Sequence, residues 1–340
     1  MLLDLFSKNK EYISCEELEY GLHFDIMGLY HCCSFFHSNK NYIPVTKLTG
    51  DLNKDFKNFL RQKDKDKKSH RKGHIIDRCE NCFSLKKQKW QNSKLIKKIA
   101  ISANKRCNCD CIYCTTHTNK QYYNSIQDIP VYDFIKKLFD KNLISQDCEV
   151  QIGGGESVLH FEFEKLISLF TDKLSSRIAV YTSGIKYSEG IERAIKLNRA
   201  NIVISIDSGN KNLYKRIKNT DKFDEVTANL KKYCEAQQYS TENHQVAMKY
   251  VLIPFVNSHE EYLDEFLNLA LNLNCKALRF DIENNWYKNN MHNLEAIKYI
   301  FKFMKYFDIK SEKMQFQHFF FQAPDYLIKN NKELYNDIQL

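Results

Sequence analysis

From about residue 94 onward, the apolar positions alternate between two spacings. Short runs rich in Ile, Val and Leu are typical of strands, and the segments after them place apolar residues three and four positions apart, as an amphipathic helix does. The expected strands cover residues 95–102, 148–152, 177–181, 201–209, 246–253 and 276–282. The expected helices cover residues 131–139, 161–169, 223–234, 262–273 and 294–306. Repeated strand–helix units predict a parallel sheet covered by helices.

Six such units are fewer than the eight of a closed barrel, so the pattern predicts an α/β fold, a partial (β/α)6 TIM-like barrel. Polar and glycine-rich clusters follow the carboxyl ends of its strands, where barrel enzymes place their chemistry. The expected domains are a small N-terminal cysteine-rich metal-binding module at 1–92, the barrel core at 93–308 and a helical or irregular extension at 309–340.

Residues 1–92 lack the strand–helix alternation. Residues 21–32 have the pattern of a hairpin whose turn lies near Met27 and Gly28. The run at 63–72 mixes Lys and Asp and is typical of a solvated loop, although a patch that meets an acidic or nucleic-acid partner is the alternative. The net charge of +9 leaves that alternative open.

Composition limits the class of protein. The chain has 340 residues, of which 43% are hydrophobic, so it can bury a sizeable core. No apolar run approaches the ~18 residues of a membrane span, and the first residues lack the basic start of a secretory signal. We therefore expect a cytoplasmic protein without membrane partners, in which the twelve cysteines are thiols and metal ligands rather than disulfides.

Two motifs carry the candidate chemistry. Cys107, Cys111 and Cys114 are spaced as C-x3-C-x2-C, and three thiolates can hold three irons of a four-iron cluster while one iron stays open. A zinc site is the alternative for this spacing taken alone. The later run 153–156 reads GGGE, in which glycines permit close approach of a ligand and Glu156 offers an acceptor for a cationic amine.

Together the motifs resemble those of the radical S-adenosylmethionine (radical SAM) superfamily, over roughly residues 95–285. The resemblance implies a [4Fe–4S] cluster at the three cysteines and reductive cleavage of S-adenosylmethionine by a donor such as flavodoxin or ferredoxin. The resulting 5′-deoxyadenosyl radical would take hydrogen from a peptide, protein or carbohydrate-type substrate. The resemblance also assigns contacts with S-adenosylmethionine to Tyr113, Gly154, Gly155, Glu156, Ser183, Ser205, Asp207 and Lys249.

This chain departs from the common motif in two places. Cys109 is an additional thiol inside the loop, and Ser157 stands where proline often follows the glutamate. We interpret Cys109 as a small buried side chain, because a fourth thiolate would close the open iron. His117, just after the loop, is a candidate group on the substrate side.

The order cysteine–hairpin–cysteine in the N-terminal module resembles SPASM-type auxiliary-cluster modules, although those usually follow the core. Four thiolates are available for a second [4Fe–4S] cluster, or for structural zinc as the alternative, and Cys33 could replace one of them. The four are Cys15, Cys32, Cys79 and Cys82.

Two other functions compete with this reading. An RNA-modifying radical enzyme would use the basic charge, and its RNA affinity would fall steeply with added salt. A non-catalytic iron or zinc protein is disfavoured, because an electron carrier gains nothing from an open iron beside a glycine-lined ligand site.

Overall fold

The computed structural model of the protein describes residues 11–32, 44–80, 82, 84–91, 93–114, 127–239, 245–320 and 323–338. The chain divides into two compact units, each built from several segments. The first unit comprises residues 1–105, 127–155 and 160–178, and the second comprises 106–126, 156–159 and 179–340.

The first unit contains five strands of the main sheet, in the order β4-β3-β2-β6-β7, and a separate antiparallel pair, β1 with β5. In the second part of β6, buried Ile99 and Ile101 alternate with half-buried neighbours, as expected of a strand. The strands are β1 (Tyr12–Ser14), β2 (Gly21–Asp25), β3 (Gly28–Tyr30), β4 (Thr46–Lys47), β5 (Lys86–Gln88), β6 (Ile96–Ser102) and β7 (Ile144–Ile152). The helices are α1 (Glu16–Tyr20), α2 (Leu52–Arg71), η2 (Asp77–Cys79), α4 (Tyr132–Asp140) and α5 (Phe163–Lys173).

The hairpin predicted at 21–32 is present. Strand β2 pairs with β3 in antiparallel register, and Met27 N donates to Asp25 Oδ1 at 3.1 Å in the turn. Strand β2 also pairs in parallel with β6, with Phe24 opposite Ile101. Every residue of β2 is buried, so the strand lacks the alternation that marks a half-buried strand in sequence. The N-terminal segment therefore extends the parallel sheet.

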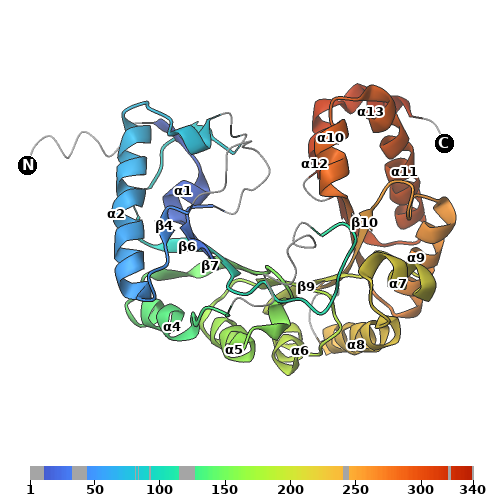
Figure 1. Cartoon of the computed structure of the whole chain (residues 1–340), viewed down its shortest axis with the longest axis horizontal. Coiled ribbons are helices and arrows are strands. Elements are labelled where there is room, and N and C mark those ends of the chain that lie inside the picture. Colours follow the sequence, from blue (N-terminus) through green and yellow to red (C-terminus); the bar gives the residue numbers. More distant parts are fainter. Residues whose placement is uncertain are drawn as a thin grey trace, which may run out of the picture. The chain divides into compact units, whose positions relative to one another are not determined.

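The loop predicted for residues 63–72 is wrong. The run forms the second half of α2, which packs against α1 and β4 (Figure 1). Lys63, Asp66, Lys67 and His70 recur at helical spacing and are all buried. Lysine stems can lie along apolar surface, and buried partners hold the charged ends, so a charged stripe here faces inward.

The second unit contains the other five strands, in the order β8-β9-β10-β11-β12. The strands are β8 (Ile178–Thr182), β9 (Ala200–Ser205), β10 (Val246–Leu252), β11 (Ala277–Ile282) and β12 (Gln317–Phe320). The α-helices are α6 (Glu189–Lys196), α7 (Lys211–Lys218), α8 (Phe223–Ala236), α9 (Glu260–Asn272), α10 (Asn284–Asn290), α11 (Leu294–Lys313), α12 (Ala323–Asn330) and α13 (Lys332–Asp337). The short 3-10 turns are η4 (Ser157–Leu159) and η5 (Gln237–Tyr239).

All six strands of the predicted strand–helix repeat are present, as β6 to β11. Pairs β9–β10 and β10–β11 are parallel, as the repeat requires. Strand β12 is an addition: it lies in the segment expected to be helical or irregular and pairs in parallel with β11. The fold is therefore α/β with a largely parallel sheet, the architecture of a partial TIM-like barrel.

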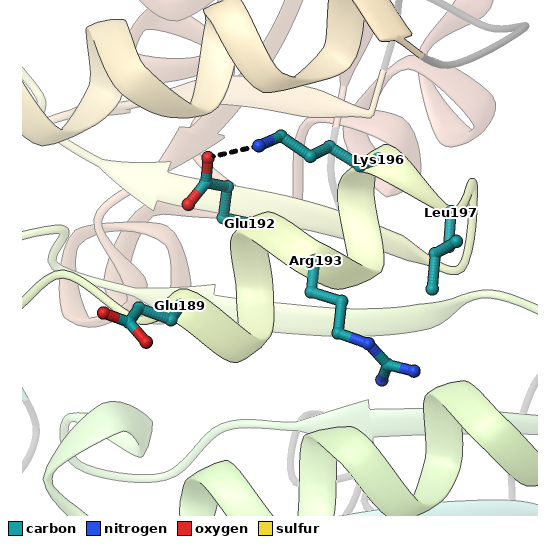
Figure 2. Close-up of a pocket in the computed structure, with 5 residues that line it drawn as sticks. All are labelled: Glu189, Glu192, Arg193, Lys196 and Leu197. Carbon is teal, nitrogen blue, oxygen red and sulfur yellow. Dashed lines mark ion pairs between the residues drawn. The ribbon is translucent and has the colours of Figure 1, made fainter.

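Helix α6 shows how the outer helices meet solvent. Ile191, Ala194 and Ile195 are buried, while Lys196 and Glu192 pair at 2.8 Å on the opposite side (Figure 2). Solvent screens such an exposed i,i+4 pair, so it adds little to stability. The shallow hollow beside these charges is a solvated helix face. Among the described helices, none is long and apolar enough to cross a membrane.

Candidate active site

Side chains of β8 and β11 meet on the partly exposed face of the sheet of the second unit. Arg279 on β11 donates from Nη1 to the hydroxyl of Tyr181 on β8 at 3.1 Å, although β9 and β10 separate the two strands. The guanidinium also lies 5.7 Å from the centroid of the Tyr181 ring. Adjacent strands lie about 4.8 Å apart, so a flat sheet would hold β8 and β11 roughly 14 Å apart. The two long side chains therefore meet over the face of β9 and β10, where Tyr181 packs against Val203, Ala247 and Ala277.

The cysteine loop at 107–114 is held by the carboxyl end of α7. The backbone N–H groups of Asp110 and Ile112 donate to the carbonyls of Lys218 and Ile217, at 2.9 and 3.0 Å. The last carbonyls of a helix lack partners within the helix, so they are available to a neighbouring segment. Asn219 ends α7 in the left-handed conformation, with φ at 50°. The loop is thus fixed by backbone contacts that side-chain replacement leaves in place.

Cys109 lies between the loop thiols Cys107 and Cys111 and is buried, with 4% of its surface exposed. A hydrogen bond from Cys109 lowers the pKa of Cys107. The same donor lowers the pKa of Cys111 to about 6, and the positive charge of Lys218 adds to that shift. The thiolate is the form that ligates metal, so the environment of the loop favours ligation. The side chains present fit an iron–sulfur cluster with three protein ligands.

A buried network connects the loop to the end of β9. The Tyr113 hydroxyl donates to Asp207 Oδ2 at 2.5 Å, and Lys218 Nζ donates to Tyr113 Oη at 2.9 Å and forms an ion pair with Asp207. Val251 N donates to Asp207 Oδ1 at 2.8 Å. Burial alone would lower the pKa of Lys218, but the charges of Asp207 and Cys111 outweigh burial and raise that pKa well above its usual value. Lys218 is therefore a fixed cation beside the cysteine loop.

Glu156 is fully buried and its carboxylate has a fixed orientation. Oε1 accepts a hydrogen bond from the Thr182 hydroxyl at 2.6 Å, and Oε2 accepts one from Ser183 N at 2.6 Å. The Ser183 hydroxyl donates to Asn108 Oδ1 at 3.1 Å, so the same turn also contacts the cysteine loop. Ser157, at the position where proline is common, donates to the Tyr181 carbonyl at 2.8 Å. A hydrogen bond to the end of β8 thus replaces the rigid ring of proline.

The glycine run, in the first unit, packs against the segment that follows β6. Gly154 has φ at 111°, and a Cβ atom there would lie 2.8 Å from the Asn104 carbonyl oxygen. Gly155 N donates to the same oxygen at 3.2 Å. The absence of a side chain at 154 is therefore required by the protein's own backbone, and the expectation that glycines serve approach to a ligand stays a prediction.

Charged residues occupy the partly exposed face of β10 and β11. Lys249 Nζ pairs with Asp281 Oδ2 at 3.0 Å, and Ser205 on β9 lies in register with Lys249. Burial raises the pKa of Asp281, although the charge of Lys249 acts in the opposite direction. Lys249 and Ser205 lie on adjacent strands, as expected of residues that share a site.

The sequence analysis did not identify Lys218, Asn108 or Arg279 as site residues. Lys218 ends a helix with several other cations, and Arg279 lies within an apolar strand, so neither carries a local signal. His117 and Cys33 lie outside the described residues. The four module cysteines are in the first unit, with Cys15 buried and the others half-buried.

The chain belongs to the radical SAM superfamily, since the family model described as "Radical SAM superfamily" matches residues 101–270, half of the sequence. Two curated relatives are a GTP 3′,8-cyclase of Vibrio parahaemolyticus, 28% identical over 177 residues, and a probable GTP 3′,8-cyclase of Methanococcus maripaludis, 26% identical over 143. These matches cover 50% and 41% of this chain, and 49% and 46% of the relatives. The chain thus spans about half the length of each.

Among solved structures, the chain resembles SuiB of Streptococcus suis bound to precursor peptide SuiA, with a TM-score of 0.55 and 12% sequence identity. The match covers 91% of this chain and 62% of SuiB. At this identity the likeness is one of fold. Membership of this superfamily implies chemistry based on a [4Fe–4S] cluster and S-adenosylmethionine.

Proposed function

We propose that Cys107, Cys111 and Cys114 ligate a [4Fe–4S] cluster whose open iron binds S-adenosylmethionine, and that the enzyme abstracts hydrogen from a peptide, protein or carbohydrate-type substrate. The observation that supports this most is the cysteine loop itself, held through its backbone by α7 and lying beside the buried cation Lys218. When bound, the cluster supplies the electron that cleaves S-adenosylmethionine to the 5′-deoxyadenosyl radical.

The protein side chains orient the reactants. Glu156, with both carboxylate oxygens fixed by Thr182 and Ser183, would accept from the amino group of S-adenosylmethionine, alongside the backbone of Gly154 and Gly155. Ser183, Ser205 and Lys249 would contact its ribose and carboxylate. These assignments rest on the positions of Ser183 and Ser205 at the ends of β8 and β9, and on Lys249 of β10, which lies in register with Ser205.

We assign Asp207 a different role from the contact with S-adenosylmethionine that the sequence resemblance implies. Its carboxylate is fully buried and already accepts from Tyr113, Lys218 and Val251. It would therefore position Tyr113 and Lys218 against the loop, and Tyr113 would present its ring toward the adenine.

Two observations support the proposed substrate class: the side chains on the partly exposed face of β8 to β11, and the fold. Arg279, Lys249 and Asp281 give that face charges of both signs, which suit a polar substrate. SuiB, whose fold this chain resembles, was solved with a precursor peptide, which favours a peptide or protein substrate. A low-potential donor such as flavodoxin or ferredoxin would supply electrons, which fits a cytoplasmic location.

The first experiment tests cleavage. Anaerobically reconstituted protein, reduced with dithionite and given S-adenosylmethionine, should release 5′-deoxyadenosine, measured by liquid chromatography. The Cys107→Ala, Cys111→Ala, Cys114→Ala triple variant is the control and should release none. Wild-type protein that contains iron but releases no 5′-deoxyadenosine would contradict the proposed chemistry.

The second experiment tests the nucleotide alternative, which the two cyclase relatives favour. GTP, a short RNA and a peptide library are each added to the reduced enzyme, and deuterium transfer from labelled substrate into 5′-deoxyadenosine is measured. We expect transfer from the peptide pool. Transfer from GTP or RNA would replace the proposed substrate class with a nucleotide or nucleic acid.

A further inference from the structure

Three metal-ligating side chains of the second unit meet between α11 and β12. One ligand atom from each of Asp308, Glu312 and His318 lies within 4.8 Å of the ligand atoms of the other two. The group combines two carboxylates with one imidazole, and each of these is a common ligand of divalent metal ions.

The turn after α11 brings these side chains together. Asp308 and Glu312 are four positions apart, so they lie one above the other on the same face of the helix. Just after α11, Gln315 takes the left-handed conformation with φ at 60°, and Phe316 N donates to the Ser311 carbonyl at 2.9 Å. The chain therefore reverses within a few residues, and β12 returns alongside α11.

The group lies on the helix-covered side of the sheet. Successive side chains of a strand point to opposite faces. In β12, His318 and Phe320 contact Phe307 of α11, with ring centroids 5.6 and 5.9 Å away. Phe319, between them, lies opposite Arg279 of β11 and shares its face. The sheet therefore separates His318 from the face that carries Arg279 and the candidate active site.

Both ring nitrogens of His318 face oxygen atoms. Nε2 lies 2.6 Å from Asp308 Oδ1, and Nδ1 lies 3.4 Å from the Phe316 carbonyl oxygen. A histidine that ligates a metal ion usually donates its other ring N–H to a carboxylate or a backbone carbonyl, which fixes the ring. The Phe316 carbonyl provides that contact. A metal ion at Nε2 can then replace the proton that Nε2 shares with Asp308.

Negative charge exceeds positive charge in the group. Asp308 and Glu312 are like charges one helical turn apart, an arrangement that destabilises a helix. Within the described part of the chain, the ion pair of Asp308 is with His318, and the Glu312 side chain has no hydrogen bond or ion pair of its own. A divalent cation would neutralise both carboxylates while the imidazole stays uncharged.

A buried hydroxyl without a partner lies beside the two carboxylates. Tyr335 of α13 is 7% exposed, and among the described residues its hydroxyl has no hydrogen-bond partner. Burial raises the pKa of Tyr335, and the nearby charges of Asp308 and Glu312 act in the same direction, so the hydroxyl keeps its proton. An unpaired buried donor is unfavourable and often marks a water molecule or an ion. A water molecule bound to a metal ion can accept this hydrogen bond.

We propose that Asp308, Glu312 and His318 bind a divalent transition-metal ion that joins α11 to β12. One imidazole nitrogen and two carboxylate oxygens suit Mn²⁺ and Zn²⁺, and water completes the coordination on the side where Glu312 is exposed. Strand β12 has only four residues and lies at the end of the sheet, so the ion gives it a second attachment. The ion is structural, and its site does not depend on the proposed function.

Binding of Mn²⁺ to the anaerobically reconstituted full-length protein tests the proposal, because thiolates prefer softer ions than Mn²⁺. Electron paramagnetic resonance measures free Mn²⁺ during the titration. We expect the protein to bind about one Mn²⁺ per chain that the Asp308→Asn, Glu312→Gln, His318→Gln triple variant does not bind. Zn²⁺ should displace this ion, since Zn²⁺ binds such ligands more tightly. His292→Gln replaces an exposed histidine of the same unit and is the matched control, which should bind as the wild type does.

Equal Mn²⁺ binding by the wild type and the triple variant, or binding by neither, would overturn the proposal. Glu312→Gln keeps the test decisive if the triple variant does not fold, because this exposed side chain has no other described partner. Glu312→Gln should weaken Mn²⁺ binding by more than about tenfold, since loss of an outer hydrogen-bond partner alone costs about 10–100-fold. Unchanged affinity would exclude Glu312 and the site with it.

Hydrogen exchange provides a readout of the structural role. Mn²⁺ should slow exchange of the backbone amides of residues 317–320 in the wild type, because the ion holds β12 against α11. The same amides should not respond to Mn²⁺ in Glu312→Gln. Exchange in β12 of the wild type that is the same with and without Mn²⁺ would contradict an ion that joins the two elements.

Discussion

Replacing Lys218 with Met removes the cation beside the cysteine loop but keeps a straight aliphatic chain in its place. The ammonium and its partner Asp207 are 2% and 0% exposed, so water cannot compensate for the lost charge. Removing one partner of a buried pair costs about 3–5 kcal/mol, because the other charge remains buried and uncompensated. Tyr113 and Val251 still donate to Asp207, so we expect the lower end, about 3 kcal/mol.

Lys215→Met on the same helix is the matched control. Lys215 and Asp221 are 61% and 55% exposed, so solvent screens their attraction and removing the lysine charge should change the unfolding free energy little. The assay is urea unfolding of reduced, metal-free protein, followed by hydrogen exchange in peptides from α7 and β9. A local measurement is needed because a chain with two compact units need not unfold in one transition.

The double variant Lys218→Met, Asp207→Asn isolates the uncompensated charge. Asparagine carries no charge, and its Oδ1 can still accept from Val251 N while its Nδ2 can donate to the Tyr113 hydroxyl oxygen, so the double variant should recover part of the lost stability. The loss of Lys218 should also raise the pKa of Cys111, measured by the pH dependence of its alkylation. Equal unfolding free energies for the two lysine variants, or no recovery in the double variant, would refute this account of the network.

Replacing any one of the three loop thiols with Ala should abolish the S-adenosylmethionine-binding cluster, because two thiolates cannot hold a cube that already lacks one protein ligand, whereas the Cys109→Ala variant should keep its iron. Iron analysis and cleavage assays measure both results. Loss of the cluster in Cys109→Ala, together with its retention in one of the other three variants, would exclude the ligand assignment. Glu156→Ala should leave the iron content intact. It should weaken S-adenosylmethionine binding about ten- to more than a hundred-fold, since a charge-assisted hydrogen bond contributes about 1.5–3 kcal/mol. Unchanged affinity for S-adenosylmethionine in an anaerobic titration would show that Glu156 is not part of the site. Both Gly154 and Gly73 have positive φ, so replacing either with Ala costs about 1–2 kcal/mol. Gly154→Ala should destabilise the protein more than Gly73→Ala, because only a Cβ atom at position 154 would clash with the backbone. Equal unfolding midpoints for the two glycine variants would contradict that reason.

The sequence alone predicted the strand–helix repeat and the cysteine loop. Both are local: apolar periodicity reports which face of an element is buried, and C-x3-C-x2-C places its thiols within eight residues. The hairpin near Met27 and Gly28 was predictable for the same reason, since turn chemistry depends on a few adjacent residues.

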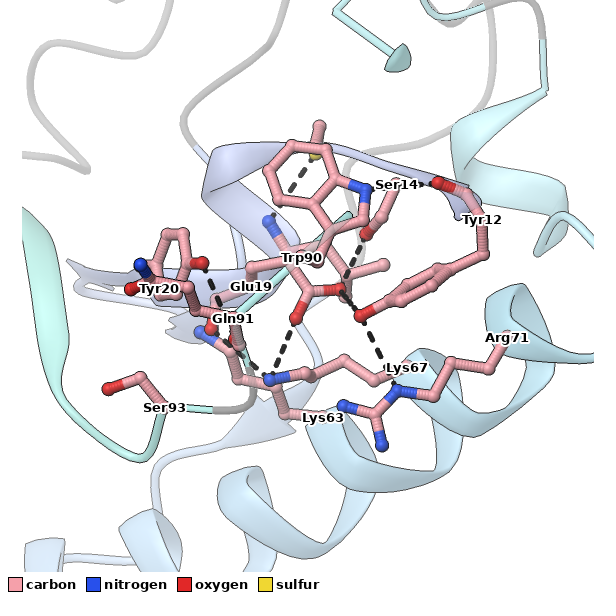
Figure 3. Close-up of polar contacts among 12 residues, drawn as sticks. Tyr12, Ser14, Glu19, Tyr20, Lys63, Lys67, Arg71, Trp90, Gln91 and Ser93 are labelled. Carbon is pink, nitrogen blue, oxygen red and sulfur yellow. Dashed lines mark hydrogen bonds and ion pairs between the residues drawn. The ribbon is translucent and has the colours of Figure 1, made fainter. Parts of the chain in front are cut away.

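Tertiary structure decided the features that depend on partners distant in sequence. The sequence pattern of the charged run at 63–72 is that of a solvated segment. In the structure, Lys67 is buried because Glu19, nearly fifty residues away, provides a buried partner for it (Figure 3). Tyr113, Asp207 and Lys218 carry no shared motif, yet they form one network because a loop, a strand end and a helix end meet there. The sequence alone does not show whether a charged side chain is buried, because burial of a charge requires a partner that only the fold brings near.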